Sequence, residues 1–229
     1  MNDQEELQKY TRRDFAAWAA SAGLLTALPS VANAVAVAER EVAITTADGT
    51  CDAYFVAPTA PQGGKTPIAE VMPLMQALTP AMHLSDGKAF VAWLDAQPEV
   101  DKARKIGTTG YCMGGPIAVR TASVAPGRVG AVGTFHGAAM VTPAPDSPHR
   151  LIAQTKAQYL IAVAGNDDQH DPQAKVALRE ALAAAKLPGE VEVYPAAHGW
   201  CPPDTQVYDA AQSERAWARL LANFKQALG

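Results

Sequence analysis

The sequence has few of the residues from which disulfide scaffolds and metal sites are built. It holds three cysteines in 229 residues, which is too few for a small fold held together by disulfides. No C-x-x-C pair is present, and no cluster of cysteine and histidine has zinc-site spacing. A redox role for a thiol is therefore the weakest hypothesis, and we expect no disulfide between Cys51 and Cys201.

Excess charge and long apolar runs are also lacking. The chain carries 19 basic and 23 acidic side chains, a net charge of -4 and a pI near 5.7, so neither nucleic acid nor an anionic membrane is expected as a partner. No apolar run beyond the N-terminal region is long enough to span a bilayer. With 48% hydrophobic residues and no repeats, the sequence predicts one globular domain with a sizeable core.

The first 34 residues have the order of an export signal. Arg12 and Arg13 precede one spacer residue and Phe15, which is the twin-arginine pattern, and a moderately apolar run covers residues 16–32. Small-residue A-x-A cleavage sites end at Ala34, Ala36 and Ala38, the first being the best match. We expect a signal peptide over residues 1–34, a mature domain over 35–229, and a periplasmic or secreted protein exported by the twin-arginine machinery. The alternative is an ordinary amphipathic helix.

Strand-like and helix-like segments alternate along the mature chain. Two alternating segments, 41–46 and 52–56, flank an Asp-Gly turn and predict a β-hairpin. Helices are predicted from Thr79 to before Pro98, over 172–186 and at the C-terminus. Further strands are predicted before residue 110 and at 130–135, 159–164 and 191–194. This order predicts an α/β fold with a mainly parallel sheet, flanking helices and the hairpin added at one edge.

A nucleophile-elbow pattern, G-x-C-x-G, lies between a predicted strand and a predicted helix. The sharp turn needs small residues two positions either side of its centre, and Gly110 and Gly114 stand there. The residue at the centre, Cys112, is at a helix N-terminus, which lowers the pKa of a thiol. The pattern predicts Cys112 as a nucleophile; a buried cysteine in a glycine-rich turn is the alternative.

Two later segments could supply the partners of this thiol. Both follow predicted strands, so both would lie where parallel sheets bind ligands. The order nucleophile, acid, histidine is that of an α/β-hydrolase triad. His198 would take the thiol proton, and a carboxylate would hold its tautomer. Asp167, Asp168 and Asp171 compete for that role; we favour Asp168, then Asp167, and expect the others to be solvated or to cap the next helix.

Three motifs together resemble the dienelactone hydrolase family of α/β-hydrolases. They are Gly-Tyr-Cys-Met-Gly-Gly at 110–115, Asn-Asp-Asp-x-x-Asp-Pro at 166–172 and His-Gly-Trp-Cys-Pro-Pro-Asp at 198–204. The resemblance covers almost all of the mature chain. It implies hydrolysis of an ester or lactone through a cysteinyl acyl-enzyme, as in a carboxymethylenebutenolidase, with neither a metal nor an organic cofactor.

The resemblance also implies the role of each site residue. Cys112 matches the nucleophile, His198 the base and Asp168, or alternatively Asp167, the acid, while the backbone N–H of Met113 would be an oxyanion donor. Two further residues fall at the ends of predicted strands and are candidates to line the substrate pocket, with simple packing as the alternative: His136 and Trp200.

Two departures from the family pattern bear on activity. Members that act on dienelactone have an arginine shortly after the histidine, whereas this chain has Trp, Cys and Pro at 200–202. Comparison with the family pattern also predicts that a strand–helix–strand block is missing before Thr79. In the family the loop of this block supplies a second oxyanion N–H and an acidic residue that interacts with the thiol. We therefore expect weak ester hydrolysis and low stability. The alternative function is a catalytically silent family remnant or a binding protein.

Replacing Arg12 and Arg13 together by lysine is expected to leave the precursor in the cytoplasm, because twin-arginine export reads the arginine pair. Cell fractionation with immunoblotting measures the distribution. Arg40→Lys, beyond the predicted cleavage sites, serves as the control and should be exported normally. Unchanged periplasmic accumulation of the double variant would contradict the assignment.

Overall fold

The computed structural model describes residues 37–46, 49–58, 72, 75–76, 78–98, 100–203 and 205–229. These residues belong to two units, one ending at Lys65 and one beginning at Thr66, and each is treated by itself. Side chains are described in the second unit alone. The predicted signal peptide and the side chain of Cys51 lie outside the described residues, so export and the state of that thiol stay predictions.

The described part of the first unit is a β-hairpin. Strand β1 (Val37–Thr46) pairs antiparallel with β2 (Gly49–Pro58), and the register places Thr46 opposite Gly49. Residues 47–48 thus form the two-residue connection, which confirms the predicted hairpin. Strands β1 and β2 pair with each other along ten residues and form a two-stranded sheet. Because the hairpin lies in the first unit and the main sheet in the second, its addition to an edge of that sheet stays a prediction.

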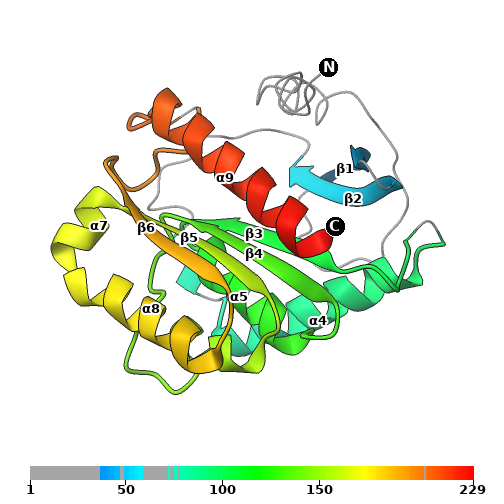
Figure 1. Ribbon diagram of the computed structural model, residues 1–229, viewed down its shortest axis with the longest axis horizontal. Coiled ribbons are helices and arrows are strands. Elements are labelled where there is room, and N and C mark those ends of the chain that lie inside the picture. The colour runs from blue at the N-terminus through cyan, green and yellow to red at the C-terminus, as the bar shows by residue number, and fades with distance from the viewer. Residues whose placement is uncertain are drawn as a thin grey trace. The chain divides into compact units, whose positions relative to one another are not determined.

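The second unit is built on a four-stranded parallel sheet in the order β3-β4-β5-β6. The strands are β3 (Ile106–Tyr111), β4 (Val129–Phe135), β5 (Gln158–Ala164) and β6 (Gly189–Tyr194). Helices α5 (Gly114–Val124) and α8 (Pro172–Ala185) cover one face, and α9 (Ala210–Leu228) covers the other (Figure 1). The predicted α/β fold with a mainly parallel sheet and flanking helices is confirmed.

Alternation along the strands divides the hydrophobic core into two clusters. On β5, Tyr159 and Ile161 pack with α5 and α8, while Leu160 and Ala162 pack with α9, because successive side chains of a strand point to opposite faces. Every residue of β4 is buried, as expected for an inner strand covered on both sides. The sheet is therefore held from both faces, and the carboxyl ends of its strands stay at one edge.

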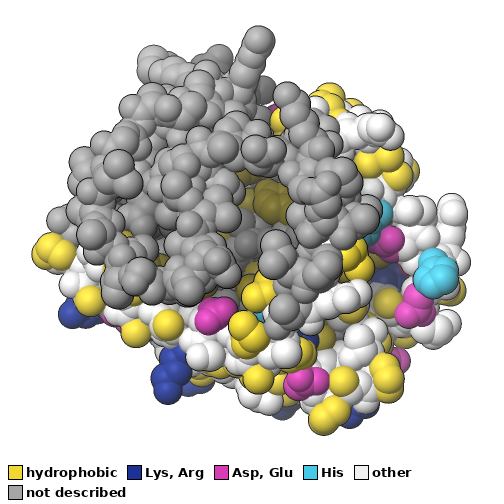
Figure 2. All heavy atoms as spheres, turned by 180° about the vertical axis from the view of Figure 1, so that it is seen from behind, with side chains coloured by type: hydrophobic (Ala, Val, Ile, Leu, Met, Phe, Trp, Pro, Cys, Tyr) yellow, Lys and Arg dark blue, Asp and Glu magenta, His cyan; other side chains and the backbone are white. Residues whose placement is uncertain are grey.

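Helix α4 (Pro80–Ala96) packs on α5 and begins as predicted, with Thr79 as its N-cap. The Thr79 hydroxyl accepts from the N–H of Met82 at 3.3 Å. Some apolar side chains of α4 are exposed to solvent, including Met82 (44% exposed) and Phe90 (66%). On the face seen in Figure 2, hydrophobic side chains reach the surface among scattered acidic and basic ones.

Beyond β3 the sheet has no further strand among the described residues. Most of residues 59–77, where the family's strand–helix–strand block is predicted to be missing, lie outside the described residues, so the deletion stays a prediction. A short helix, α6 (Pro148–Leu151), and a 3-10 turn (Ile152–Gln154) lie between β4 and β5. Within the described ranges no helix is long and apolar enough to cross a membrane.

The junction of β3 and α5 forms the predicted elbow, but the glycines that close packing requires there differ from those expected. A Cβ on Gly110 would lie 1.9 Å from the carbonyl oxygen of Gly114, so glycine is needed there. A Cβ on Gly114 would meet nothing within 4 Å, whereas one on Gly115 would lie 2.9 Å from the Cα of Gly137. The prediction that Gly114 itself must be small was wrong, because its backbone, and not its Cβ position, faces Gly110.

Gly110→Ala is expected to lower the free energy of unfolding by at least ~2 kcal/mol, because a Cβ overlapping backbone atoms cannot be relieved by a change of rotamer. Gly114→Ala is the matched control, four residues away in the same elbow. It should be neutral or stabilise the protein by up to ~1 kcal/mol, because alanine is the better helix former. Urea unfolding measures both; equal losses would contradict the close approach at Gly110.

Candidate active site

Three side chains meet at the carboxyl ends of the strands. Cys112 follows β3, Asp167 follows β5 and His198 follows β6. The Nε2 atom of His198 lies 3.1 Å from the Cys112 sulfur, and its Nδ1 atom lies 2.7 Å from Oδ2 of Asp167. The structure thus joins a thiol, an imidazole and a carboxylate in one line, although Cys112 and His198 are 86 positions apart in the sequence.

The carboxylate in this line is Asp167, and the preference for Asp168 was wrong in its placement. The segment that carries both aspartates is a short helix, α7 (Gly165–His170). Successive residues of a helix point about 100° apart, so the two aspartates face different neighbours. Asp168 Oδ2 lies 2.7 Å from Nζ of Lys175 on α8. Asp171 caps α8 and accepts from the N–H of Gln173 at 3.1 Å, as the sequence predicted for a competing aspartate.

Asn166 is a site residue that the sequence analysis missed. Its Oδ1 atom accepts a hydrogen bond from the backbone N–H of His198 at 2.7 Å. Neighbouring residues of α7 therefore hold the histidine twice, once at its backbone and once at its ring. In the sequence, Asn166 stands directly beside the candidate acids and follows a predicted strand. The sequence does not show which group its side-chain amide contacts, so no role could be predicted for it.

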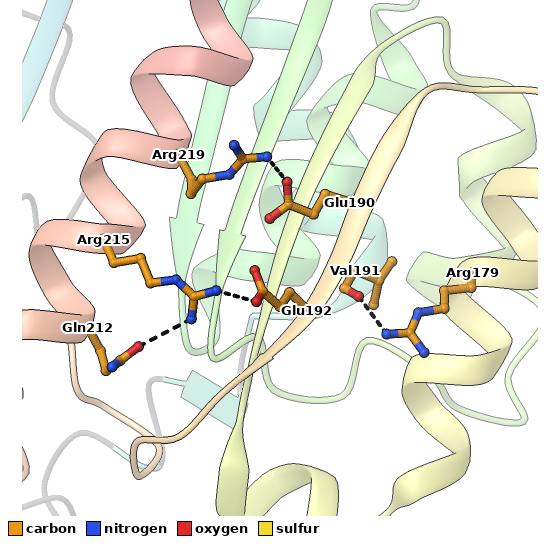
Figure 3. A network of polar contacts seen from close by, with 7 residues as sticks. All are labelled: Arg179, Glu190, Val191, Glu192, Gln212, Arg215 and Arg219. Atoms are coloured by element: carbon orange, nitrogen blue, oxygen red, sulfur yellow. Dashed lines mark hydrogen bonds and ion pairs between the residues drawn. The ribbon is translucent and has the colours of Figure 1, made fainter. Parts of the chain in front are cut away.

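The strand that leads to His198 is held on both sides by charged groups (Figure 3). Arg219 and Arg215 of α9 pair with Glu190 and Glu192 of β6. From α8, Arg179 donates to the carbonyl oxygen of Val191 at 2.8 Å. Exposed ion pairs contribute at most about 1 kcal/mol each, so the network mainly orients α8 and α9 against this edge strand.

The thiol and the imidazole share a proton in favour of the histidine. The hydrogen bond to His198 lowers the pKa of Cys112, and the backbone N–H of Met113 lowers it further, while burial opposes both. The bond with the Cys112 sulfur raises the pKa of His198 to about 9, and Asp167 adds to this effect against burial. The two shifts together favour a thiolate–imidazolium pair near neutral pH. The side chains of His198 and Asp167 are 30% and 35% exposed, so the pair is open to solvent.

The two residues predicted to line the pocket lie behind the triad. Trp200 is fully buried and stacks on Tyr194, with ring centroids 5.2 Å apart; its pocket role was wrong, and it is a packing residue. His136 is 2% exposed, and its ring centroid lies 5.0 Å from that of His198 and 4.9 Å from that of Trp200. The ring of His136 therefore packs against that of His198 from the core side.

Two surface hollows, of about 250 and 350 Å³, lie away from these residues. The first is lined by α9 and the amino ends of β5 and β6, and the second by α8 and β6. Neither hollow is lined by Cys112, Asp167 or His198. Among the described residues no group of three or more His, Cys, Asp or Glu side chains is arranged to hold a metal ion.

Comparison with known proteins extends this picture. The model of the family described as "Dienelactone hydrolase family" matches residues 12–228, beginning inside the predicted signal segment. A curated relative, "Putative carboxymethylenebutenolidase" of Escherichia coli (strain K12), is 32% identical over 122 residues, which cover 52% of this chain and 45% of that protein. The match therefore spans about half the length of this curated relative.

Solved structures show the same fold. One, titled "Putative Dienelactone Hydrolase from Klebsiella pneumoniae subsp. pneumoniae MGH 78578", has a TM-score of 0.62 at 20% identity over 83% of this chain and 99% of that one. Another, titled "Dienelactone Hydrolase-like Promiscuous Phospotriesterase P91 from Metagenomic Libraries", has a TM-score of 0.61 at 22% identity over 77% and 75% of the two chains. Because the family model matches nearly the full length and the fold agrees, this chain belongs to the dienelactone hydrolase family.

Proposed function

We propose that the protein hydrolyses a small carboxylic ester or lactone through an acyl-enzyme on Cys112. The observation that carries the proposal is the continuous contact from the Cys112 sulfur through His198 to Asp167, at 3.1 and 2.7 Å. Family membership and the carboxymethylenebutenolidase name of the Escherichia coli relative support the same substrate class. The role of acid falls to Asp167 rather than Asp168, because Asp167 alone of the two contacts the imidazole.

The reaction then runs in two steps. The Cys112 thiolate attacks the carbonyl carbon, the carbonyl electrons move to oxygen, and His198 donates its proton to the leaving alkoxide, which gives a thioester. Water next attacks the thioester carbonyl, and His198 takes one proton from that water. The Cys112 thiolate then leaves, and the carboxylic acid product releases its remaining proton to solvent as a carboxylate. Asp167 holds His198 in the tautomer with Nε2 toward sulfur and stabilises its charge.

Stabilisation of the oxyanion is the weakest part of this site. The N–H of Met113, at the start of α5, is the donor that the elbow supplies, and a second donor belongs to the block predicted to be missing. Loss of one such donor costs about a hundredfold to a thousandfold in turnover. We therefore infer an active enzyme with low turnover; the alternative is a silent family member that retains the triad by descent.

Substrate choice departs from dienelactone itself. Members acting on that compound bind its carboxylate with an arginine after the histidine, and here Trp200, which is fully buried, and Pro202 occupy that segment. We therefore infer that the substrate is an ester or lactone without the carboxylate that this arginine binds in dienelactone.

Turnover of p-nitrophenyl acetate tests the proposal. Cys112→Ala should abolish it, and Asp167→Asn should lower kcat by about tenfold or more, because the histidine loses its orienting carboxylate. Asp168→Asn is the matched control and should stay within about threefold. We expect the unmodified protein to turn over well below about 10 per second. A larger loss with Asp168→Asn than with Asp167→Asn would return the acid role to Asp168, and turnover by Cys112→Ala would refute the mechanism.

The rate of Cys112 alkylation by iodoacetamide should increase with pH, with a midpoint below the ordinary thiol pKa of about 8.5, because His198 stabilises the thiolate. In His198→Ala the midpoint of this increase should shift upward toward about pH 8.5. Turnover should fall again above about pH 9, where His198 loses the proton needed by the leaving group. Mass spectrometry of limiting alkylation, followed at each pH, measures the profile; an unchanged profile in His198→Ala would exclude the ion pair.

A further inference from the structure

His136 makes a contact with the nucleophile that triad chemistry does not require. Its Nδ1 atom accepts a hydrogen bond from the backbone N–H of Cys112 at 3.2 Å. The same N–H also points to the carbonyl oxygen of Phe135, at 3.1 Å. The end of β4 thus holds the elbow residue through two acceptors, one from the backbone and one from a side chain.

Both partners of this contact have left-handed backbone conformations. Cys112 has φ of +49° and His136 has φ of +41°, a region that residues other than glycine, asparagine and aspartate occupy at a cost. A conformation of this kind persists only where surrounding contacts hold it. The backbone N–H of His136 donates to the carbonyl oxygen of Ala162 at 2.8 Å, so His136 is itself fixed to β5.

The state of the His136 ring follows from its surroundings. Burial, and then the charge of His198, lower the pKa of His136 to about 4, so its ring is neutral near pH 7. Because Nδ1 accepts from Cys112, the ring proton must be on Nε2. Among the described residues Nε2 is buried without a hydrogen-bond partner, and the ring packs edge-on to Trp200 at an interplanar angle of 71°. Within this part of the chain the polar contact of the ring is therefore the one with Cys112.

We propose that His136 is a positioning residue, which uses Nδ1 as an acceptor to hold the backbone of Cys112 in the conformation that directs its sulfur at His198. The role in catalysis rests on the ester hydrolysis proposed above, whereas the effect on the geometry of Cys112 does not. Without the His136 acceptor, the backbone N–H of Cys112 donates to the Phe135 carbonyl oxygen alone. The backbone of Cys112 is then less restrained, and so is the 3.1 Å contact between its sulfur and Nε2 of His198. The thiolate is then less stabilised, although the triad residues are all present.

A pair of isosteric variants separates the hydrogen bond from ring packing. His136→Asn keeps an acceptor near the position of Nδ1 and tolerates a left-handed φ, whereas His136→Leu has a similar shape without an acceptor. We expect the Leu variant to lose about tenfold or more in kcat with KM within about threefold, and its Cys112 alkylation profile to move up toward pH 8.5. The Asn variant should keep both values near those of the unmodified protein. Equal losses in both variants, or no loss in the Leu variant, would overturn the proposal.

Alkylation is independent of turnover, so the two proposals can fail separately. A protein without esterase activity whose alkylation profile responds to these variants as described would refute the proposed function and support the positioning role. Circular dichroism verifies folding. If the Leu variant does not fold, imidazole ¹⁵N NMR of the unmodified protein decides: a proton on Nε2 and none on Nδ1 at pH 7 is expected, and a proton on Nδ1 would overturn the proposal.

Discussion

The contact between the Cys112 sulfur and His198 Nε2 is the interaction on which the site depends. It joins two loops 86 residues apart and moves both pKa values in the direction that charges the pair. The parallel sheet makes this contact feasible, because the carboxyl ends of its strands lie at one edge. The elbow between β3 and α5 places the Cys112 sulfur at that edge. Gly110 is required there, because a Cβ at this position would overlap the backbone of Gly114.

The His198 loop is held in place by several small contacts. Asn166 accepts from its backbone and Asp167 from its ring, while Arg179 and the ion pairs of β6 fix the strand before it. Helix α7 connects these functions, because its turn sends Asp167 toward the histidine and Asp168 toward Lys175. Two adjacent aspartates thus have separate partners: Asp167 contacts the imidazole of His198, and Asp168 links α7 to α8 through Lys175.

The same contrast applies to the two histidines of the site. Their rings lie 5.0 Å apart, yet the pKa of His198 is raised to about 9 and that of His136 is lowered to about 4. His198 contacts a thiolate and a carboxylate and reaches solvent, whereas His136 is enclosed by β4, Trp200 and the elbow. Environment thus shifts the pKa values of two neighbouring imidazoles in opposite directions, and the neutral ring of His136 accepts a hydrogen bond from the backbone of Cys112.

The sequence by itself determined the α/β order, the hairpin, the capped helix at Thr79 and the elbow around Cys112, because these depend on local patterns of polarity, glycine and proline. It also placed His198 after the last strand. Tertiary structure alone decided between Asp167 and Asp168, revealed Asn166, buried Trp200 and set Gly110 rather than Gly114 against the backbone. These outcomes rest on which way a side chain points after a turn. That direction is set by a short helix and by neighbours distant in the chain, which no local pattern contains.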